Sequence, residues 1–170
     1  VLRGALGEHN VSLLRDAEEK LKKSSMTLDL KVTSHKQRIY GVNTGFGALH
    51  NLNVSLKDAK LLQKNLICSH SVGVGEPLPE EIVRTAMLIL ANSLARGYSG
   101  VRLSTVRTIL EMINKRVCPI VPEKGSVGAS GDLQPLSHIA LVMMGQGEAF
   151  LKGERMNGGK AMKKAGIDPI

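Results

Sequence analysis

The residues with the most unusual chemical potential lie in a glycine-rich segment, residues 125–138 (GSVGASGDLQPLSH). In the triplet Ala129-Ser130-Gly131, the unhindered glycine nitrogen could attack the carbonyl carbon of the alanine if the backbone turns tightly enough. Ring closure, followed by loss of the serine hydroxyl as water, would leave an exocyclic methylene. That product is an electrophile, which no ordinary side chain supplies.

The same segment has a simpler interpretation. On spacing alone, a flexible connection whose Ser130 or Asp132 caps the following helix is the commoner arrangement. Two standard motifs do not fit: no Lys follows the glycines as in a phosphate-binding loop, and Gly-Ala-Ser-Gly-Asp is not the Gly-x-Ser-x-Gly turn of a serine nucleophile. The electrophile hypothesis therefore needs support from the rest of the chain.

Composition predicts a mainly α fold and a single domain over residues 1–170. The chain is 42% hydrophobic but only 2% aromatic, and it has no tryptophan. Its length suffices for one sizeable core. That core must be built from aliphatic side chains and methionine, which favours packed helices over a sandwich of sheets.

Hydrophobic periodicity and capping residues predict helices joined by glycine-rich loops. Ser55 and Pro79 would begin two helices, and Asp132 would cap another with Pro135 in its first turn. Residues 38–51 carry three glycines within seven residues, which predicts a loop able to place side chains at a site. We expect a short helix at 11–23, little strand, and helices over most of 55–72, 79–96, 104–116 and 132–149.

Charge and cysteine patterns disfavour several classes of protein. The formal net charge of +8 comes from scattered Lys and Arg without the interleaved aromatics of a nucleic-acid surface, and no apolar run approaches the ~20 residues of a membrane span. Cys68 and Cys118 lack CxxC spacing and have apolar neighbours, which predicts buried free thiols and a cytoplasmic protein. No metal is expected, because metal-ligand spacing is missing around His9, His35, His50 and His138.

Four motifs occur in order along the chain: YGVNTGFG, NLICSHSVGVGEPLP, GYSGVR and GSVGASGDLQPLSH. Together they resemble the N-terminal part of the aromatic amino acid ammonia-lyases, most of all the histidine ammonia-lyases, from about Val11 to the end. The resemblance implies the N-terminal domain of that family's superhelical fold. It also implies that Ala129-Ser130-Gly131 cyclises autocatalytically into 4-methylidene-imidazol-5-one (MIO), and that L-histidine is deaminated non-oxidatively to trans-urocanate and ammonia.

Tyr40, in the glycine-rich loop, matches the family's catalytic tyrosine, which removes the β-proton of the substrate. Because the unperturbed pKa of tyrosine is ~10, a base working near neutral pH needs surroundings that stabilise the phenolate. Without the motif, the preferred interpretation of Tyr40 is an amphipathic ring packed at the base of a loop.

The pair Ser69-His70 is the best clue to the substrate. At this place the resemblance associates Ser-His with histidine enzymes, and His-Leu or Phe-Leu with tyrosine and phenylalanine enzymes. An imidazole there could exchange a hydrogen bond with the substrate imidazole, since one ring nitrogen donates and the other accepts. The alternative for His70 is a core histidine bonded to the backbone, the commoner fate of a lone His on an apolar helix.

The family's chains are much longer, so we expect the N-terminal portion of a lyase that lacks the C-terminal helical portion. In the family, three subunits of a homotetramer build each site, which implies assembly into a homo-oligomer or with a longer lyase chain. The remaining portion supplies further site residues, an arginine among them, so the chain alone should be inactive. A natural short product, half of a split enzyme and an engineered piece stay open.

Two other functions stay open. One is a catalytically silent subunit that binds a full-length lyase through exposed apolar helix faces, such as the run Met87-Leu88-Ile89-Leu90. The other is a tyrosine or phenylalanine lyase, or an aminomutase, that uses the same electrophile. In every case the expected partners are an amino acid and other lyase chains, without nucleic acid or membrane.

Overall fold

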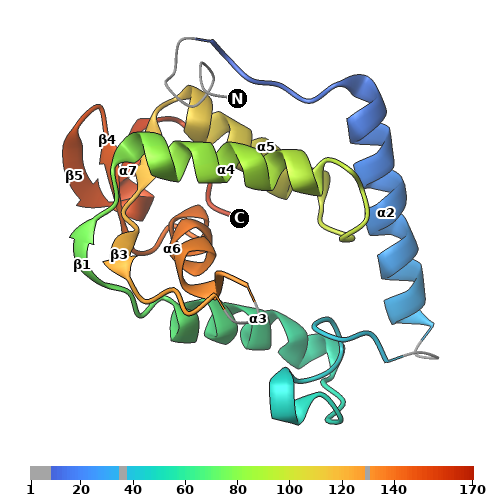
Figure 1. Cartoon of the computed structure of the whole chain (residues 1–170). Coiled ribbons are helices and arrows are strands. Elements are labelled where there is room, and N and C mark those ends of the chain that lie inside the picture. Colours follow the sequence, from blue (N-terminus) through green and yellow to red (C-terminus); the bar gives the residue numbers. More distant parts are fainter. Residues whose placement is uncertain (1–8, 35–37, 129–130) are drawn as a thin grey trace.

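The computed structural model describes residues 9–34, 38–128 and 131–170 (Figure 1). Its helices are α2 (Arg15–Thr33), the 3-10 turn η1 (Gly47–Leu49), α3 (Leu56–His70), α4 (Glu80–Leu94), α5 (Leu103–Asn114), α6 (Leu133–Met143) and α7 (Gly158–Lys164). Short strands lie between the later helices: β1 (Val74–Pro77), β2 (Val117–Pro119), β3 (Pro122–Lys124), β4 (Glu148–Leu151) and β5 (Glu154–Asn157). Helices predominate, which confirms the mainly α fold predicted from composition.

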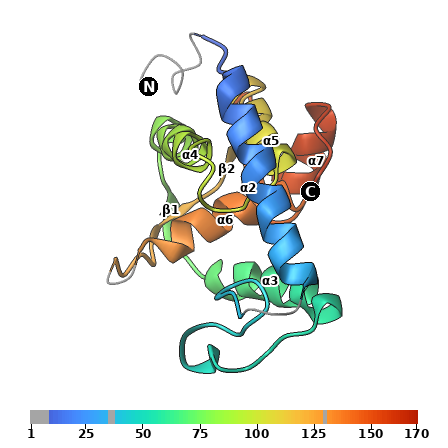
Figure 2. The same ribbon diagram turned by 90° about the vertical axis from the view of Figure 1, so that its right-hand side faces the viewer.

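The helices pack in pairs. α4 lies against α5, and α3 lies against α6, which also contacts α7 and β2. α2 packs on α5 and runs along one edge of the molecule toward the loop that precedes α3 (Figure 2). An ion pair between Arg107 and Glu18 (2.8 Å) and a hydrogen bond from the Gly100 N–H to Ser24 Oγ (3.0 Å) fasten α2 to its neighbours.

Two small antiparallel sheets connect the helices. In the first, β1 pairs with β3, with Val74 opposite Lys124 and Pro77 opposite Pro122. In the second, β4 pairs with both β2 and β5. The β1–β3 ribbon bears on function, because β1 continues the chain from the end of α3 and β3 leads into the glycine-rich loop before α6 (Figure 1).

The core consists of aliphatic side chains and methionine, as the shortage of aromatic residues predicted. Its fully buried members include one from each of five helices, Leu21, Met87, Met112, Ile139 and Met162, together with Val117 of β2. On α4, Met87 is fully buried, whereas Ile89 is 53% exposed. This apolar helix therefore keeps one uncovered side.

Several predicted helices are confirmed, and α3 begins with its predicted side-chain cap. Ser55 caps α3, because its Oγ accepts the Asp58 N–H (3.2 Å) and donates to Asp58 Oδ2 (2.6 Å). α4 begins directly after Pro79, and α5 covers most of the range 104–116. The short helix predicted at 11–23 is longer than expected, since α2 continues to Thr33.

The helix predicted over 132–149 is too long, and its predicted cap is wrong. α6 ends at Met143, because Gly145 and Gly147 have φ values of +75° and +61°, which interrupt a right-handed helix. The chain then enters β4. Asp132 does not cap α6, since its carboxylate instead accepts a hydrogen bond from Ser126 Oγ.

Both cysteines are free thiols, but only one is buried. Cys118 lies in β2, where burial raises the pKa of its thiol to about 12. Cys68 is exposed on α3, so the expectation of burial is wrong for this residue. Apolar neighbours in the sequence did not predict which side of the helix is covered. Within the residues that the structure describes, no cluster of metal-ligating side chains occurs and no helix could span a membrane.

Truncation of a core methionine should cost far more stability than truncation on the uncovered side of α4. Met112→Ala removes a fully buried side chain and should lower the free energy of unfolding by about 2–5 kcal/mol, whereas Ile89→Ala should cost about 1 kcal/mol or less. Urea unfolding followed by circular dichroism measures both. Equal losses would contradict the packing described here.

Candidate functional site

The described residues of the glycine-rich loop between β3 and α6, 125–128 and 131–132, are exposed, and three of them have a backbone conformation that favours glycine. Gly125, Gly128 and Gly131 have φ values of +137°, +70° and +112°, which other residues rarely adopt. Val127 is 88% exposed, and the loop extends beyond the helices around it (Figure 2). A Cβ at Gly131 would meet no atom within 4 Å. Ala129 and Ser130, the other two predicted cofactor-forming residues, lie outside the described residues.

The β1–β3 ribbon brings this loop to the end of α3. Because Val74 pairs with Lys124 in antiparallel register, Gly73 and Gly125 face each other at the next position. A Cβ on Gly125 would come within 3.1 Å of the Gly73 Cα. The segment that follows Ser69 and His70 is thereby held against the start of the glycine-rich loop.

Two side chains of α6 secure this meeting point. The Gly73 N–H donates a hydrogen bond to His138 Nε2 (3.2 Å). Gln134 is only 5% exposed and packs on both glycines: a Cβ on Gly73 would lie 1.9 Å from its Nε2, and one on Gly125 would lie 3.1 Å from its Cδ. Among the residues that the structure describes, the buried Gln134 Nε2 has no hydrogen-bond partner, a state that costs stability.

Burial lowers the pKa of His138 below its ordinary value. This shift agrees with the geometry, because an Nε2 that accepts the Gly73 N–H must lack a proton. The neutral imidazole with its proton on Nδ1 is therefore the form that holds Gly73.

Ser69 and His70 occupy the last turn of α3. His70 Nδ1 lies 2.9 Å from the Leu66 carbonyl oxygen, so this nitrogen carries the proton and donates to the carbonyl. Ser69 Oγ donates to the same carbonyl (2.9 Å) and lies 3.1 Å from His70 Nδ1. His70 thus makes the bond to the backbone that the simpler interpretation predicted. In the neutral ring this bond leaves the other nitrogen, Nε2, as a hydrogen-bond acceptor.

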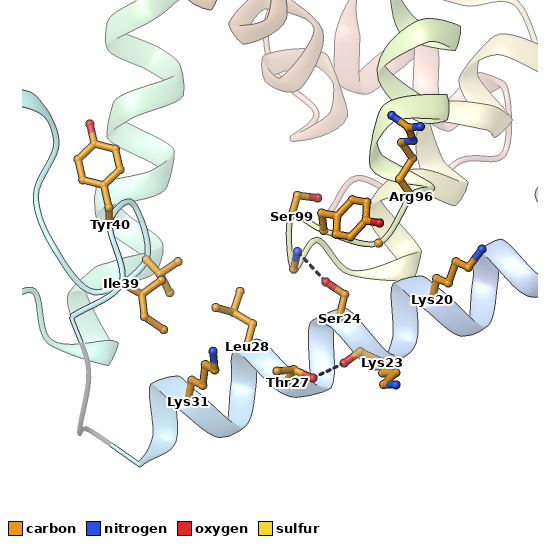
Figure 3. Close-up of a pocket in the computed structure, with 14 residues that line it drawn as sticks. Lys20, Lys23, Ser24, Thr27, Leu28, Lys31, Ile39, Tyr40, Arg96 and Ser99 are labelled. Carbon is orange, nitrogen blue, oxygen red and sulfur yellow. Dashed lines mark hydrogen bonds between the residues drawn. The ribbon is translucent and has the colours of Figure 1, made fainter.

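Tyr40 lies in the loop before α3 and is 64% exposed. Its hydroxyl oxygen accepts the Gly47 N–H (3.2 Å), and its ring meets Phe46 edge to face at 5.8 Å. With Ile39, it borders a groove of about 620 Å³ between α2 and residues 96–100, and its hydroxyl points away from α2 (Figure 3). The contacts described for Tyr40 lie within its own loop, so they do not join it to His70 or to Gly131.

Sequence reasoning missed Gln134, His138 and Gly73 as parts of this site. Gln134 and His138 stand four residues apart just after the loop, a spacing that puts both on one face of a helix. That spacing could have singled them out as a pair. Nothing local marks Gly73, because its role depends on a strand pairing with a segment about fifty residues away.

Comparison with known proteins gives a consistent result. The aromatic amino acid lyase family matches residues 1–170. The histidine ammonia-lyase of Caldanaerobacter subterraneus subsp. tengcongensis is 53% identical over 170 residues, which are 100% of this chain and 33% of the relative. That of Alkaliphilus oremlandii is 48% identical over 162 residues, which cover 95% of this chain and 32% of the relative. The chain thus spans about a third of the length of these curated relatives.

Solved structures agree with these relatives. Phenylalanine aminomutase from Pantoea agglomerans is 37% identical with a TM-score of 0.93, over 99% of this chain and 32% of that one. Histidine ammonia-lyase from Trypanosoma cruzi is 35% identical with a TM-score of 0.87, over 98% of this chain and 33% of that one. These similarities confirm that the chain has the N-terminal fold expected from its motifs.

Acid should destabilise the chain through His138. Because the folded state lowers the pKa of His138 below 6.5, the stability it contributes is present above pH 6.5 and is lost as the pH falls through the lowered pKa. Denaturant unfolding between about pH 7.5 and pH 5 measures this loss. His138→Gln keeps an acceptor that does not titrate, so it should lose less stability over the same range. Identical losses in parent and variant would contradict the assignment.

Proposed function

Because the chain belongs to the aromatic amino acid lyase family, we propose that it forms part of a histidine ammonia-lyase, which converts L-histidine to trans-urocanate and ammonia. The observation that carries the proposal is the state of His70. Its Nδ1 is held by the Leu66 carbonyl, which leaves Nε2 to accept the N–H of a substrate imidazole. The similarity of the whole chain to histidine ammonia-lyases supports the same substrate.

We assign the electrophile to Ala129-Ser130-Gly131. Of these three residues the structure describes Gly131, where the conformation needed for ring formation can be examined. The φ of Gly131 is one that glycine adopts and other residues avoid, and the space where a Cβ would lie is open. A glycine with open space at its Cβ position fits a cyclisation of the backbone there. The resulting group, MIO, supplies an electrophilic carbon for the substrate's amino group. No metal is assigned.

Tyr40 is proposed as the base that takes the β-proton of the substrate onto its hydroxyl oxygen. The Gly47 N–H donates to that oxygen and so fixes its orientation. Since the described contacts of Tyr40 lie within its own loop, we propose that further copies of the chain, or a longer lyase chain, bring a tyrosine to the site around His70. A homo-oligomer is therefore the proposed working state.

A cytoplasmic location is also proposed. Cys68 and Cys118 are free thiols. Free thiols are typical of reducing compartments, whereas small secreted domains commonly pair their cysteines. Cys68, which is exposed, would be open to oxidation in an oxidising compartment.

An aminomutase is the second candidate. The solved structures that resemble this chain include a phenylalanine aminomutase and a tyrosine aminomutase. The same electrophile would serve an enzyme that moves an amino group instead of releasing it. The pair Ser69-His70 favours histidine as the substrate and therefore the lyase.

The proposal can be tested in a chimera in which residues 1–170 replace the matching third of the Caldanaerobacter enzyme. We expect it to form urocanate from L-histidine, detected by ultraviolet absorbance, and to leave phenylalanine and tyrosine unchanged. The Ser130→Ala chimera should be inactive, because the methylene carbon comes from that serine. The 170-residue chain assayed by itself should form no urocanate. A folded parent chimera that acts on tyrosine or phenylalanine instead would contradict the proposal.

Substrate choice should depend on His70. His70→Leu in the chimera should lower kcat/KM for L-histidine by about 100-fold or more, because a site built to hydrogen-bond a polar group loses most of its discrimination without the partner. The absorbance of the conjugated ring should persist in this variant. Cys68→Ala, an exposed change in the same helix, is the matched control and should leave kcat/KM unchanged. If His70→Leu retained the parent's kcat/KM, His70 would be structural only.

A further inference from the structure

We propose that His138 is a positioning residue: through the Gly73 N–H, and with the packing of Gln134, it fixes the turn after His70 against the glycine-rich loop. This inference rests on the proposed function, because the groups that it positions are the substrate-binding imidazole and the loop that holds Gly131. His138 itself touches neither substrate nor reacting atoms in this account.

The connection from His70 to Gly73 is short and is held at both ends. At the helix end, the Ser71 N–H donates to the Ile67 carbonyl (3.1 Å) and Ser71 Oγ donates to the same oxygen (2.8 Å). Val72 is 65% exposed and adds little packing. At the far end, the bond from the Gly73 N–H to His138 Nε2 fixes the chain. Loss of that bond would free the segment that orients the last turn of α3.

The same helix face also controls the loop. α6 begins two residues after Gly131, and Gln134 and His138 lie one turn apart on it. Gln134 covers Gly73 and Gly125 together, so neither glycine can move toward α6 without displacing its buried amide. α6 thus contacts both the segment after His70 and the start of the glycine-rich loop. The separation of these two segments determines how His70 and Gly131 are placed relative to a substrate.

α6 is a firm support, because residues that follow His138 on the same helix belong to the core. Ile139 and Val142 are each only 1% exposed. A side chain on such a helix can hold a neighbouring backbone in a fixed position. Such precision matters because a misplacement of about 1 Å in an active site can cost about 100-fold in rate. The hydrogen bond from the Gly73 N–H to His138 therefore affects catalysis beyond its contribution to stability.

The first test measures hydrogen exchange at the Gly73 amide in the 170-residue chain. His138→Leu removes the acceptor and should speed exchange at Gly73 by about 10-fold or more. His138→Gln offers an oxygen near the position of Nε2 and should restore slow exchange. Ser137→Ala, the adjacent change on α6, should leave Gly73 as in the parent. Unchanged exchange in a folded His138→Leu chain would overturn the inference.

The second test uses the active chimera. His138→Leu should lower kcat/KM for L-histidine by about 10-fold or more, and His138→Gln should recover most of it, a rescue that lost stability alone would not give. His138→Leu could speed exchange at Gly73 and yet leave kcat/KM of an active chimera unchanged. That result would overturn the positioning role of His138 and leave the proposed function standing. An inactive parent chimera overturns the proposed function and, with it, the role given to His138.

Discussion

The close approach of Gly73 and Gly125 is the constraint on which the candidate site depends. The two residues face each other at the open end of the β1–β3 ribbon. A Cβ on Gly73 would collide with Gln134, and one on Gly125 would lie only 3.1 Å from the Gly73 Cα. Only glycine lets the two backbones come so near. The ribbon can therefore join the end of α3, with His70, to the loop that contains Gly131, although the two segments lie far apart in the sequence.

α6 links this site to the core of the protein. Ile139 and Val142 are buried in the core, and Gln134 and His138 of the same helix contact the two glycines. Core stability and site geometry are therefore coupled through one element. Gln134 Nε2 is buried without a hydrogen-bond partner among the described residues, so this arrangement carries a cost, which natural proteins accept mainly where a fixed geometry has a use.

Much of the local structure could be predicted from the sequence, because it depends on local chemistry. Ser55 caps α3 as predicted, and the scarcity of aromatic residues predicted a core of aliphatic side chains and methionine. Interactions between distant segments could not be predicted in this way. The carboxylate of Asp132 accepts a hydrogen bond from Ser126 and does not cap α6. The exposure of Cys68 could not be predicted either, since the side of α3 that is covered depends on the packing of distant elements. The contact of His138 with Gly73 likewise requires a strand pairing that no local pattern reveals.

The proposed function requires a backbone-derived electrophile in the loop that precedes α6. Ring closure by the Gly131 nitrogen would release one water, and loss of the Ser130 hydroxyl would release a second. The most direct measurement is the mass of the proteolytic peptide that contains Ala129-Ser130-Gly131, taken from the active chimera. The account predicts a peptide lighter by two waters than its sequence requires, and the unmodified mass in the Ser130→Ala variant. An unmodified peptide in a chimera that still forms urocanate would contradict it.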